Sequence, residues 1–288
     1  MGHHYVPRRY LSGFAVNERL AIFKKDTGQV FRGQPATIAN ERELYGEKLE
    51  NHLSKAIEAP SHEVFDKIAA RAPLTSRDRE ILANYIVTAW KRVPAARARV
   101  MNQLPQTIER TIDRRSDEVR QFADGDDEQL KGRATEVLSE LARVRAKLLA
   151  DPPVDIWRDI VVPERTPMMV EALLSMNWAF LTDSNGTVLS SDNPVYFFPW
   201  AGVGREESEL VFPVNQNVAM LASREKFQSN RYFEARPAAL REINRRTVHN
   251  ADRQVYARTA FEWVPRLIAK NAGPQHRLWV RAPRPVAL

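Results

Sequence analysis

The sequence contains no cysteine in its 288 residues. Disulfides, thiolate metal ligands and a cysteine nucleophile are therefore excluded. The sequence also lacks any apolar run of about eighteen residues, so we expect no membrane-spanning helix. The first residues lack the basic-then-apolar pattern of a signal peptide. From these absences we expect a cytoplasmic protein.

The common catalytic signatures are missing as well. There is no His-Glu-x-x-His sequence, no P-loop and no Gly-x-Ser-x-Gly sequence. We find no internal repeat and no low-complexity tract. An apolar fraction of 43% and a charged fraction of 27% are ordinary for a globular protein. This length can bury a large core, and we expect a single domain over residues 1–288.

The net charge is strongly positive, at +7 with a pI near 9.7. Such a balance favours a polyanionic partner, and nucleic acid or a nucleotide is the partner that we expect from charge alone. A basic background composition is the other explanation, because arginine greatly outnumbers lysine. The charge leaves both explanations open.

Polar side chains with useful chemistry concentrate in residues 1–14 and again in residues 190–195. The first stretch places His3, His4 and Tyr5 among apolar residues, and the second reads Ser-Ser-Asp-Asn-Pro-Val. Chain termini stay disordered unless something holds them, so the two stretches are expected to meet. Adjacent side chains of an extended backbone point to opposite faces. We therefore expect one of the two histidines, not both, to face a site.

The candidate catalytic residues are His3, His4, Tyr5, Asp192 and Asn193. Imidazole suits acid–base work or metal binding near neutral pH, and a partly desolvated Asp suits the same roles. His4 and Asp192 are the candidate metal ligands, and this set is compatible with a divalent metal ion whose identity the spacing does not specify. The alternative is structural: the histidines anchor the N-terminus, and Asp-Asn-Pro forms a turn.

Arginines beside these motifs are candidates for binding phosphate. Arg8 and Arg9 lie in the first stretch, and Arg92 ends an apolar helical segment. Arginine binds phosphate oxygens in a bidentate manner better than lysine does. The arginines of residues 110–120 alternate with acidic residues at helical spacing, which indicates a salt-bridged, solvated helix face.

The chain divides into three subregions by pattern. Residues 1–45 hold the N-terminal motif and a predicted hairpin around Asp26-Thr-Gly28. Residues 46–150 are predicted to be helical, with a break at Pro60, a Thr75 cap, an interruption at Pro105 and two long helices joined by an acidic turn.

Residues 151–288 are rich in strand patterns. Asn185-Gly186 between apolar runs predicts a second hairpin. The predicted fold class is α+β: an antiparallel sheet formed from the N-terminal hairpin and the C-terminal strands, with a large inserted helical block.

Several motifs, taken in order, match a known family. They are the His-His-Tyr-Val-Pro start, Lys-Arg-Val-Pro at 91–94, Ser-Asp-Asn-Pro at 191–194, Phe-Pro at 212–213 and Ile-Asn at 243–244. The chain resembles the bacterial family called domain of unknown function 4238 over nearly its whole length. Arg9 stands where the family pattern favours an aromatic residue, and Val214 stands where leucine is usual. The resemblance implies a complete family domain with its site in these motifs, but no reaction.

Two functions follow from these observations. The first is a hydrolase acting on a phosphate-containing substrate, most concretely a metal-dependent nuclease. The second is a non-catalytic nucleic-acid- or protein-binding protein in which the motifs are structural.

Overall fold

The computed structural model describes residues 2–42, 44–123, 127–153, 155–197, 207–224 and 230–271. The chain divides into two compact units. Residues 1–94 and 160–288 form one unit, which we call the core unit, and residues 95–159 form the other, which we call the arm. Among the described residues, no helix combines the length and the apolar character needed to cross a membrane.

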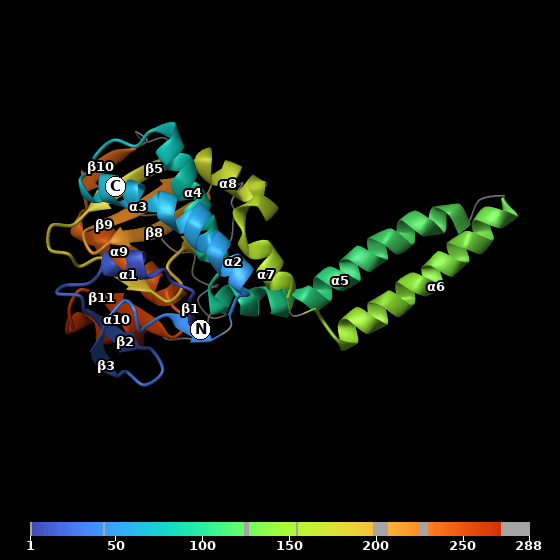
Figure 1. The fold of residues 1–288 in the computed structure, drawn as a ribbon, viewed down its shortest axis with the longest axis horizontal. Helices are drawn as coiled ribbons and strands as arrows, with labels where there is room; N and C mark the ends of the chain where they lie inside the picture. Colours follow the sequence, from blue (N-terminus) through green and yellow to red (C-terminus); the bar gives the residue numbers. More distant parts are fainter. Residues whose placement is uncertain are drawn as a thin grey trace. The chain divides into compact units, whose positions relative to one another are not determined.

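The first sheet of the core unit joins the two ends of the chain (Figure 1). Its strand order is β3 (Val30–Gly33), β2 (Leu20–Lys24), β11 (Gln254–Ala257) and β6 (Ser190–Ser191), and every pair is antiparallel. Gly28 has φ +68° in the β2–β3 turn, a conformation that favours glycine. The expected α+β class and the sheet built from both ends are confirmed.

Two helices cover one face of this sheet. Apolar residues of β2 and β11 pack against α9 (Pro237–Asn250) and α10 (Trp263–Asn271). The helix over residues 237–249 was expected from the sequence, whereas α10 was not.

A second sheet holds the remaining long strands. Its order is β10 (Arg231–Glu234), β5 (Asn177–Thr182), β9 (Val218–Ser223), β8 (Glu209–Asn215) and β7 (Tyr196–Phe197). All pairs are antiparallel except β10 with β5. A third, two-stranded sheet pairs β1 (Gly2–His4) with β4 (Asn40–Arg42), which fixes the start of the chain.

The predicted hairpin at Asn185-Gly186 is wrong. Strand β5 ends at Thr182 in the second sheet, and the next strand, β6, belongs to the first sheet. The Asp183 carboxylate accepts the backbone N–H groups of Asn185 and Thr187. This local turn therefore redirects the chain between two sheets, because side-chain hydrogen bonds from Asp stabilise turns whether or not the flanking strands pair.

The predicted break at Pro60 is also wrong. Helix α2 (Glu47–His52) continues through a π-helical segment (Leu53–Glu58) into α3 (Ala59–Ala69). Proline has no N–H to donate and its ring crowds the carbonyl one turn earlier. The wider π-helical turn just before Pro60 leaves room for the proline ring and for the missing hydrogen bond, so the helix continues past Pro60.

Helix α4 (Ser76–Lys91) begins with the predicted cap. The Thr75 hydroxyl accepts the backbone N–H of Asp78, and the Asp78 side chain accepts the backbone N–H of Thr75. Helix α8 (Pro167–Leu174) and a 3-10 turn (Pro163–Arg165) pack beside α4.

Aromatic residues join α1 (Arg8–Ser12), α3 and α4 to the second sheet. The rings of Tyr10, Phe65 and Tyr85 all contact Phe212 of β8, with ring centroids 5.3 to 6.5 Å from that of Phe212. Helices from the first hundred residues are thereby fixed against strands from the last hundred.

The arm consists mainly of two long helices, α5 (Pro94–Ala123) and α6 (Glu128–Ala150). Helix α5 begins at Pro94, and Asp127 caps α6 by accepting two backbone N–H groups. The predicted interruption at Pro105 is wrong, because α5 runs through it. A single proline removes one helical hydrogen bond, which the turns on either side tolerate here.

Acidic and basic residues of the arm nearly balance in number. Several form exposed pairs three residues apart within one helix, as predicted, for example Arg115 with Glu118 and Arg143 with Glu140. The positive excess of the chain therefore belongs to the core unit.

Candidate functional site

Tyr10 brings the two sequence motifs together. Its hydroxyl group lies 2.7 Å from the Ser190 hydroxyl oxygen and donates to the Pro213 carbonyl oxygen at 2.8 Å. Tyr5 also lies near the second motif: burial raises its pKa, and the charge of Asp192 raises it further. The expected meeting of residues 1–14 with residues 190–195 is thus present in the structure.

The carboxylate of Asp192 forms hydrogen bonds to three backbone N–H groups. Its carboxylate accepts the N–H groups of Asp252, Arg253 and Gln254 at 2.9, 2.7 and 3.0 Å. Burial raises the pKa of Asp192 to about 6, and these three hydrogen bonds oppose the increase. The side chain therefore holds the turn between α9 and β11.

Asn193 has a similar anchoring position. Its side-chain N–H donates to the Asn250 carbonyl, and the Asn250 side chain donates back to the Asn193 carbonyl. These contacts favour the structural interpretation of the Asp-Asn-Pro motif.

His3 and His4 differ as the extended backbone predicts. The buried His3 accepts the Tyr45 backbone N–H at its Nδ1 atom, at 3.0 Å, and its ring stacks on that of Tyr45. His4 is only partly buried, yet its Nε2 atom is shielded from solvent and has no hydrogen-bond partner among the described residues. His4 thus has a ring nitrogen that is both shielded from solvent and without a hydrogen-bond partner among the described residues.

Arg92 is buried and does not form one set with Arg8 and Arg9. Its guanidinium group donates to a Glu58 carboxylate oxygen and to the His4 carbonyl oxygen, both at 2.6 Å. Its Nε atom has no hydrogen-bond partner among the described residues.

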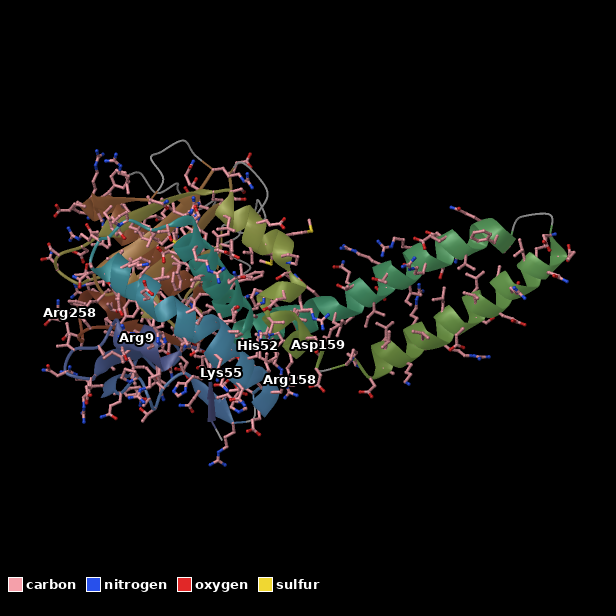
Figure 2. The ribbon with its side chains drawn as sticks, turned by 45° about the horizontal axis from the view of Figure 1, so that its top comes forward. Arg9, His52, Lys55, Arg158, Asp159 and Arg258 are labelled. Carbon is pink, nitrogen blue, oxygen red and sulfur yellow. The ribbon has the colours of Figure 1, made fainter. Side chains whose placement is uncertain are left out.

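Arg8 and Arg9 are exposed instead, and Arg9, which is labelled in Figure 2, forms an ion pair with Asp66. Arg9 also lines an open hollow of about 320 Å³ beside residues of β8 and the turn that follows it.

A group of buried and partly buried polar side chains includes Arg92, and we call it the polar cluster. Its members come from β1, the α2–α3 helix and α4: His4, Glu50, Glu58, Tyr85, Thr88 and Arg92. Glu50 lies close enough to the others for its pKa to respond to them. Burial raises that pKa, Glu58 raises it further, and Arg92 lowers it.

Several cluster atoms are buried without a hydrogen-bond partner among the described residues. They are His4 Nε2, Glu50 Oε2, Tyr85 OH, Thr88 Oγ1 and Arg92 Nε. Tyr85, Thr88 and Arg92 lie at positions i, i+3 and i+7, which share one face of a helix. The Glu58 and Arg92 charges also act on the Tyr85 hydroxyl group. Buried polar atoms without a partner therefore occur on three segments of the chain, which Arg92 joins through its hydrogen bonds to Glu58 and to the His4 carbonyl oxygen.

Sequence reasoning missed Glu50, Glu58, Tyr85 and Thr88. The available signal was the occurrence of polar residues on otherwise apolar helix faces, next to Ile57 and Ile86 for example. That pattern is weak, because a hydroxyl group on a core-facing position commonly bonds within its own helix.

The two candidate metal ligands come from different strands, since His4 ends β1 and Asp192 follows β6. Among the described residues, no three His, Asp or Glu side chains group closely enough to hold a metal ion. Both Asp192 oxygens already accept backbone N–H groups. The metal-binding role of His4 and Asp192 stays a prediction.

The fold and the polar cluster define an α+β protein with a buried polar centre between its N-terminal strand and two core helices. Residues 2–261 match the family model described as protein of unknown function (DUF4238), and the chain belongs to this family. No curated protein and no solved structure matched the chain.

Proposed function

We propose that the protein is a hydrolase of phosphate-containing compounds, and that the polar cluster is its reacting centre. The observation that supports the proposal most is the set of buried, unpaired polar atoms on His4, Glu50, Tyr85, Thr88 and Arg92. Each such atom costs about 1–3 kcal/mol of folding free energy. Native proteins keep few of them, and they are common where a ligand supplies the missing partners.

The cluster contains the groups that acid–base hydrolysis needs. Glu50 is the proposed general base, because burial raises its pKa above that of a solvated carboxyl group. The unpaired ring nitrogen of His4 is the proposed proton donor to the leaving oxygen. Arg92 Nε and the hydroxyl groups of Tyr85 and Thr88 are placed to donate hydrogen bonds to substrate oxygens.

Charge supports a phosphate-bearing substrate. The chain carries +7, and the balanced arm contributes none of this excess. Exposed Arg8 and Arg9 follow His4 in the same N-terminal segment and would attract an anion toward it. A nuclease is the most concrete form of this proposal.

The test compares hydrolysis by wild type and by Glu50→Gln, a substitution that keeps shape and removes the charge. Bis(p-nitrophenyl) phosphate, p-nitrophenyl phosphate, and single- and double-stranded DNA and RNA serve as substrates. Glu47→Gln is the matched control, because Glu47 is exposed one turn earlier on α2. We expect Glu50→Gln to lose at least about a hundredfold in rate, with its melting temperature and the control's rate unchanged.

Metal dependence is measured in the same assay, with chelator and with added Mg²⁺, Mn²⁺ or Zn²⁺. If wild type hydrolyses none of these substrates under any of these conditions, the proposal is wrong. If Glu50→Gln melts well below wild type, Glu50 is structural and the assigned centre is wrong.

A specific observation also supports the second function, a non-catalytic binding protein. The hydrogen bonds of His3, Asp192 and Asn193 to backbone groups support an anchoring role for these three residues. Wild type that binds labelled DNA or RNA in a salt-dependent manner, without cleaving it, would favour this function.

A further inference from the structure

A π-helical segment interrupts the helix that carries the two glutamates of the polar cluster. Helix α2 continues through this segment, Leu53–Glu58, into α3 (Figure 1). The Ala59 N–H donates to the Ser54 carbonyl oxygen, five residues earlier in the chain instead of the four of an α-helix. A π turn therefore holds one residue more than an α-helical turn, and such turns are frequent at functional sites.

The buried side of this helix shows what the extra residue does. Its row of buried and partly buried residues is Leu49, Leu53, Ile57, Ser61, Val64 and Ile68, at spacings of four, four, four, three and four. An α-helix turns by about 100° per residue, so three successive spacings of four would rotate this row by about 120°. The row stays buried because the π turn absorbs one residue between Leu53 and Ile57. The effective spacings are then four, three, four, three and four, which keep to one face of a helix.

The same extra residue decides where Glu58 lies. Glu50 and Glu58 are eight residues apart, which is a rotation of about 80° in an uninterrupted α-helix. With one residue absorbed they are effectively seven apart, and the rotation between them falls to about 20°. Both side chains therefore lie on one side of the helix, and both are partly buried there.

Glu58 is tied to the other segments of the cluster through Arg92. Its carboxylate oxygen accepts from the Arg92 guanidinium group at 2.6 Å, and the same group donates to the His4 carbonyl oxygen. Arg92 is 1% exposed, so this ion pair is shielded from solvent. A charge-assisted hydrogen bond of this length fixes the orientation of the guanidinium group.

Charged groups on the neighbouring elements act on Glu50. They are Arg92 of α4, Glu58, and His3 and His4 of β1. Burial raises the pKa of Glu50 most, Arg92 lowers it and Glu58 raises it. Burial also raises the pKa of the Tyr45 hydroxyl group, on which the charges of Glu50 and Glu58 act as well. Removing the charge of Glu58 therefore lowers the pKa of Glu50.

We propose that Glu58 is a positioning residue of the polar cluster and that the π-helical segment places it there, an inference that rests on the proposed function. Glu58 orients Arg92 toward the substrate oxygens and strengthens Glu50 as a base. It contacts no reacting atom in this role.

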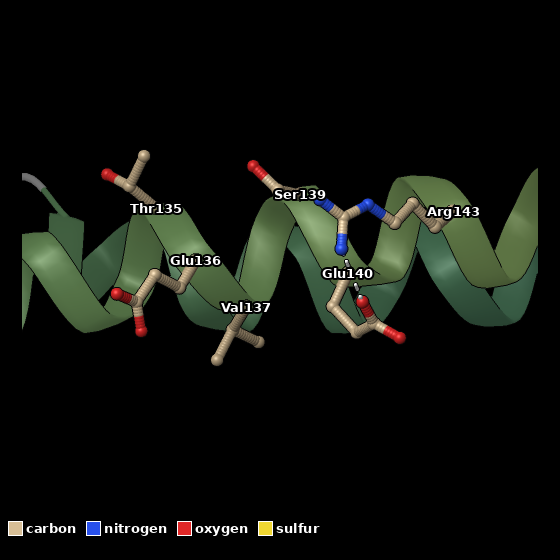
Figure 3. A pocket seen from close by; sticks show the side chains of 6 residues that line it. All are labelled: Thr135, Glu136, Val137, Ser139, Glu140 and Arg143. Atoms are coloured by element: carbon tan, nitrogen blue, oxygen red, sulfur yellow. Dashed lines mark hydrogen bonds and ion pairs between the residues drawn. The ribbon is translucent and has the colours of Figure 1, made fainter.

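The first test removes the charge of Glu58. The rates of Glu58→Gln and wild type are compared between about pH 4 and 9, on the substrate that wild type hydrolyses fastest. We expect kcat to fall about tenfold to a hundredfold, because Arg92 loses its orientation. The acidic limb of the kcat profile should move to lower pH, because Glu50 loses a negative neighbour. Glu140→Gln is the matched control and should change neither, since it removes an exposed Glu–Arg pair with Arg143 on α6 (Figure 3).

The second test changes the length of the helix in a Pro60→Ala background, which allows a straight α-helix. In an ordinary helix, deletion and insertion of one residue are equally disruptive, since each rotates one half by about 100°. Deletion of Ala56 leaves Glu50 and Glu58 seven residues apart, so kcat should match that of Pro60→Ala alone. An alanine inserted after Ala56 puts them nine apart, and kcat should fall about a hundredfold.

The titration of Glu50 tests the placement without any activity. NMR of isotope-labelled glutamate follows its carboxyl group, which is assigned by its absence from Glu50→Gln. The pKa of Glu50 should be lower in Glu58→Gln than in wild type. If this holds while wild type hydrolyses nothing, the proposed function is wrong and the placement of Glu58 stands.

Two results overturn the positioning role. One is an unchanged pKa of Glu50 in Glu58→Gln, and the other is an equal loss of kcat on deletion and on insertion. All rates and titrations are measured well below the melting temperature of each variant. If the insertion variant does not fold, the pH profile of Glu58→Gln decides, and a profile identical to that of wild type refutes the proposal.

Discussion

Removing the Asp192 side chain is the sharpest test of whether the second motif is structural. In Asp192→Ala the backbone N–H groups of Asp252, Arg253 and Gln254 lose an acceptor that now lies 2.7 to 3.0 Å away. Asp192 is 3% exposed, so solvent does not replace the carboxylate freely. The substitution should therefore lower the free energy of unfolding.

The size of the loss follows from two opposing contributions. Each unpaired buried donor costs about 1–3 kcal/mol, so three donors cost about 3–9 kcal/mol. The buried carboxylate also carries a desolvation penalty, which raises its pKa to about 6, and removing the carboxylate relieves that penalty in part. We therefore expect a net loss of free energy of unfolding at the lower end of that range, about 3 kcal/mol, a large share of the 5–15 kcal/mol typical of a folded protein.

Urea unfolding at pH 7.5, followed by tryptophan fluorescence, measures this loss. Asp192→Asn should lower the free energy of unfolding by less, about 1–2 kcal/mol. Its remaining oxygen can still accept the N–H groups of Arg253 and Gln254, whereas its amide NH₂ group cannot accept the Asp252 N–H. Asp252→Asn is the control, because that side chain is 44% exposed, and it should change stability by less than about 0.5 kcal/mol.

The reasoning is refuted if Asp192→Ala unfolds within about 0.5 kcal/mol of wild type. If that variant is stable but no longer hydrolyses substrate, Asp192 belongs to the catalytic centre after all.

Two further predictions concern buried groups near this motif. Tyr10→Phe keeps the ring but removes the hydrogen bonds to Ser190 and to the Pro213 carbonyl. We expect the free energy of unfolding, measured in the same urea assay, to fall by about 1–3 kcal/mol. An unchanged free energy of unfolding would contradict the anchoring role of Tyr10. Burial lowers the pKa of His249 to about 4, so its unfolded form binds the proton first. His249 is only partly buried, so solvent screening reduces the effect. Wild type should therefore lose about 1–2 kcal/mol of free energy of unfolding relative to His249→Gln as pH falls from 6.5 to 4, and parallel pH curves for the two would disprove this.

Local chemistry determined much of the fold from the sequence alone. The Thr75 cap, the Gly28 turn and the acidic turn between the two long helices each depend on a few neighbouring residues. Such features survive in any tertiary context, because their hydrogen bonds or backbone angles are satisfied within one turn of the chain.

Predictions failed where the outcome depended on distant partners. The Asn185-Gly186 turn is local, but whether its flanking segments pair depends on which sheet has an open edge. Ser190 and Ser191 pair with β11, sixty residues farther along the chain. Likewise Pro60 predicts a break, but the π-helical segment before it lets the helix continue against α4.

The candidate site shows the same division. The sequence by itself determined that residues 1–14 and 190–195 carry unusual polar groups, and that adjacent His3 and His4 face opposite ways. Only the tertiary structure decided that Asp192 holds backbone groups while Glu50, Tyr85 and Thr88 join His4 around Arg92. The reason is physical: whether a polar atom is satisfied depends on every segment that packs around it, and spacing along one segment does not contain that information.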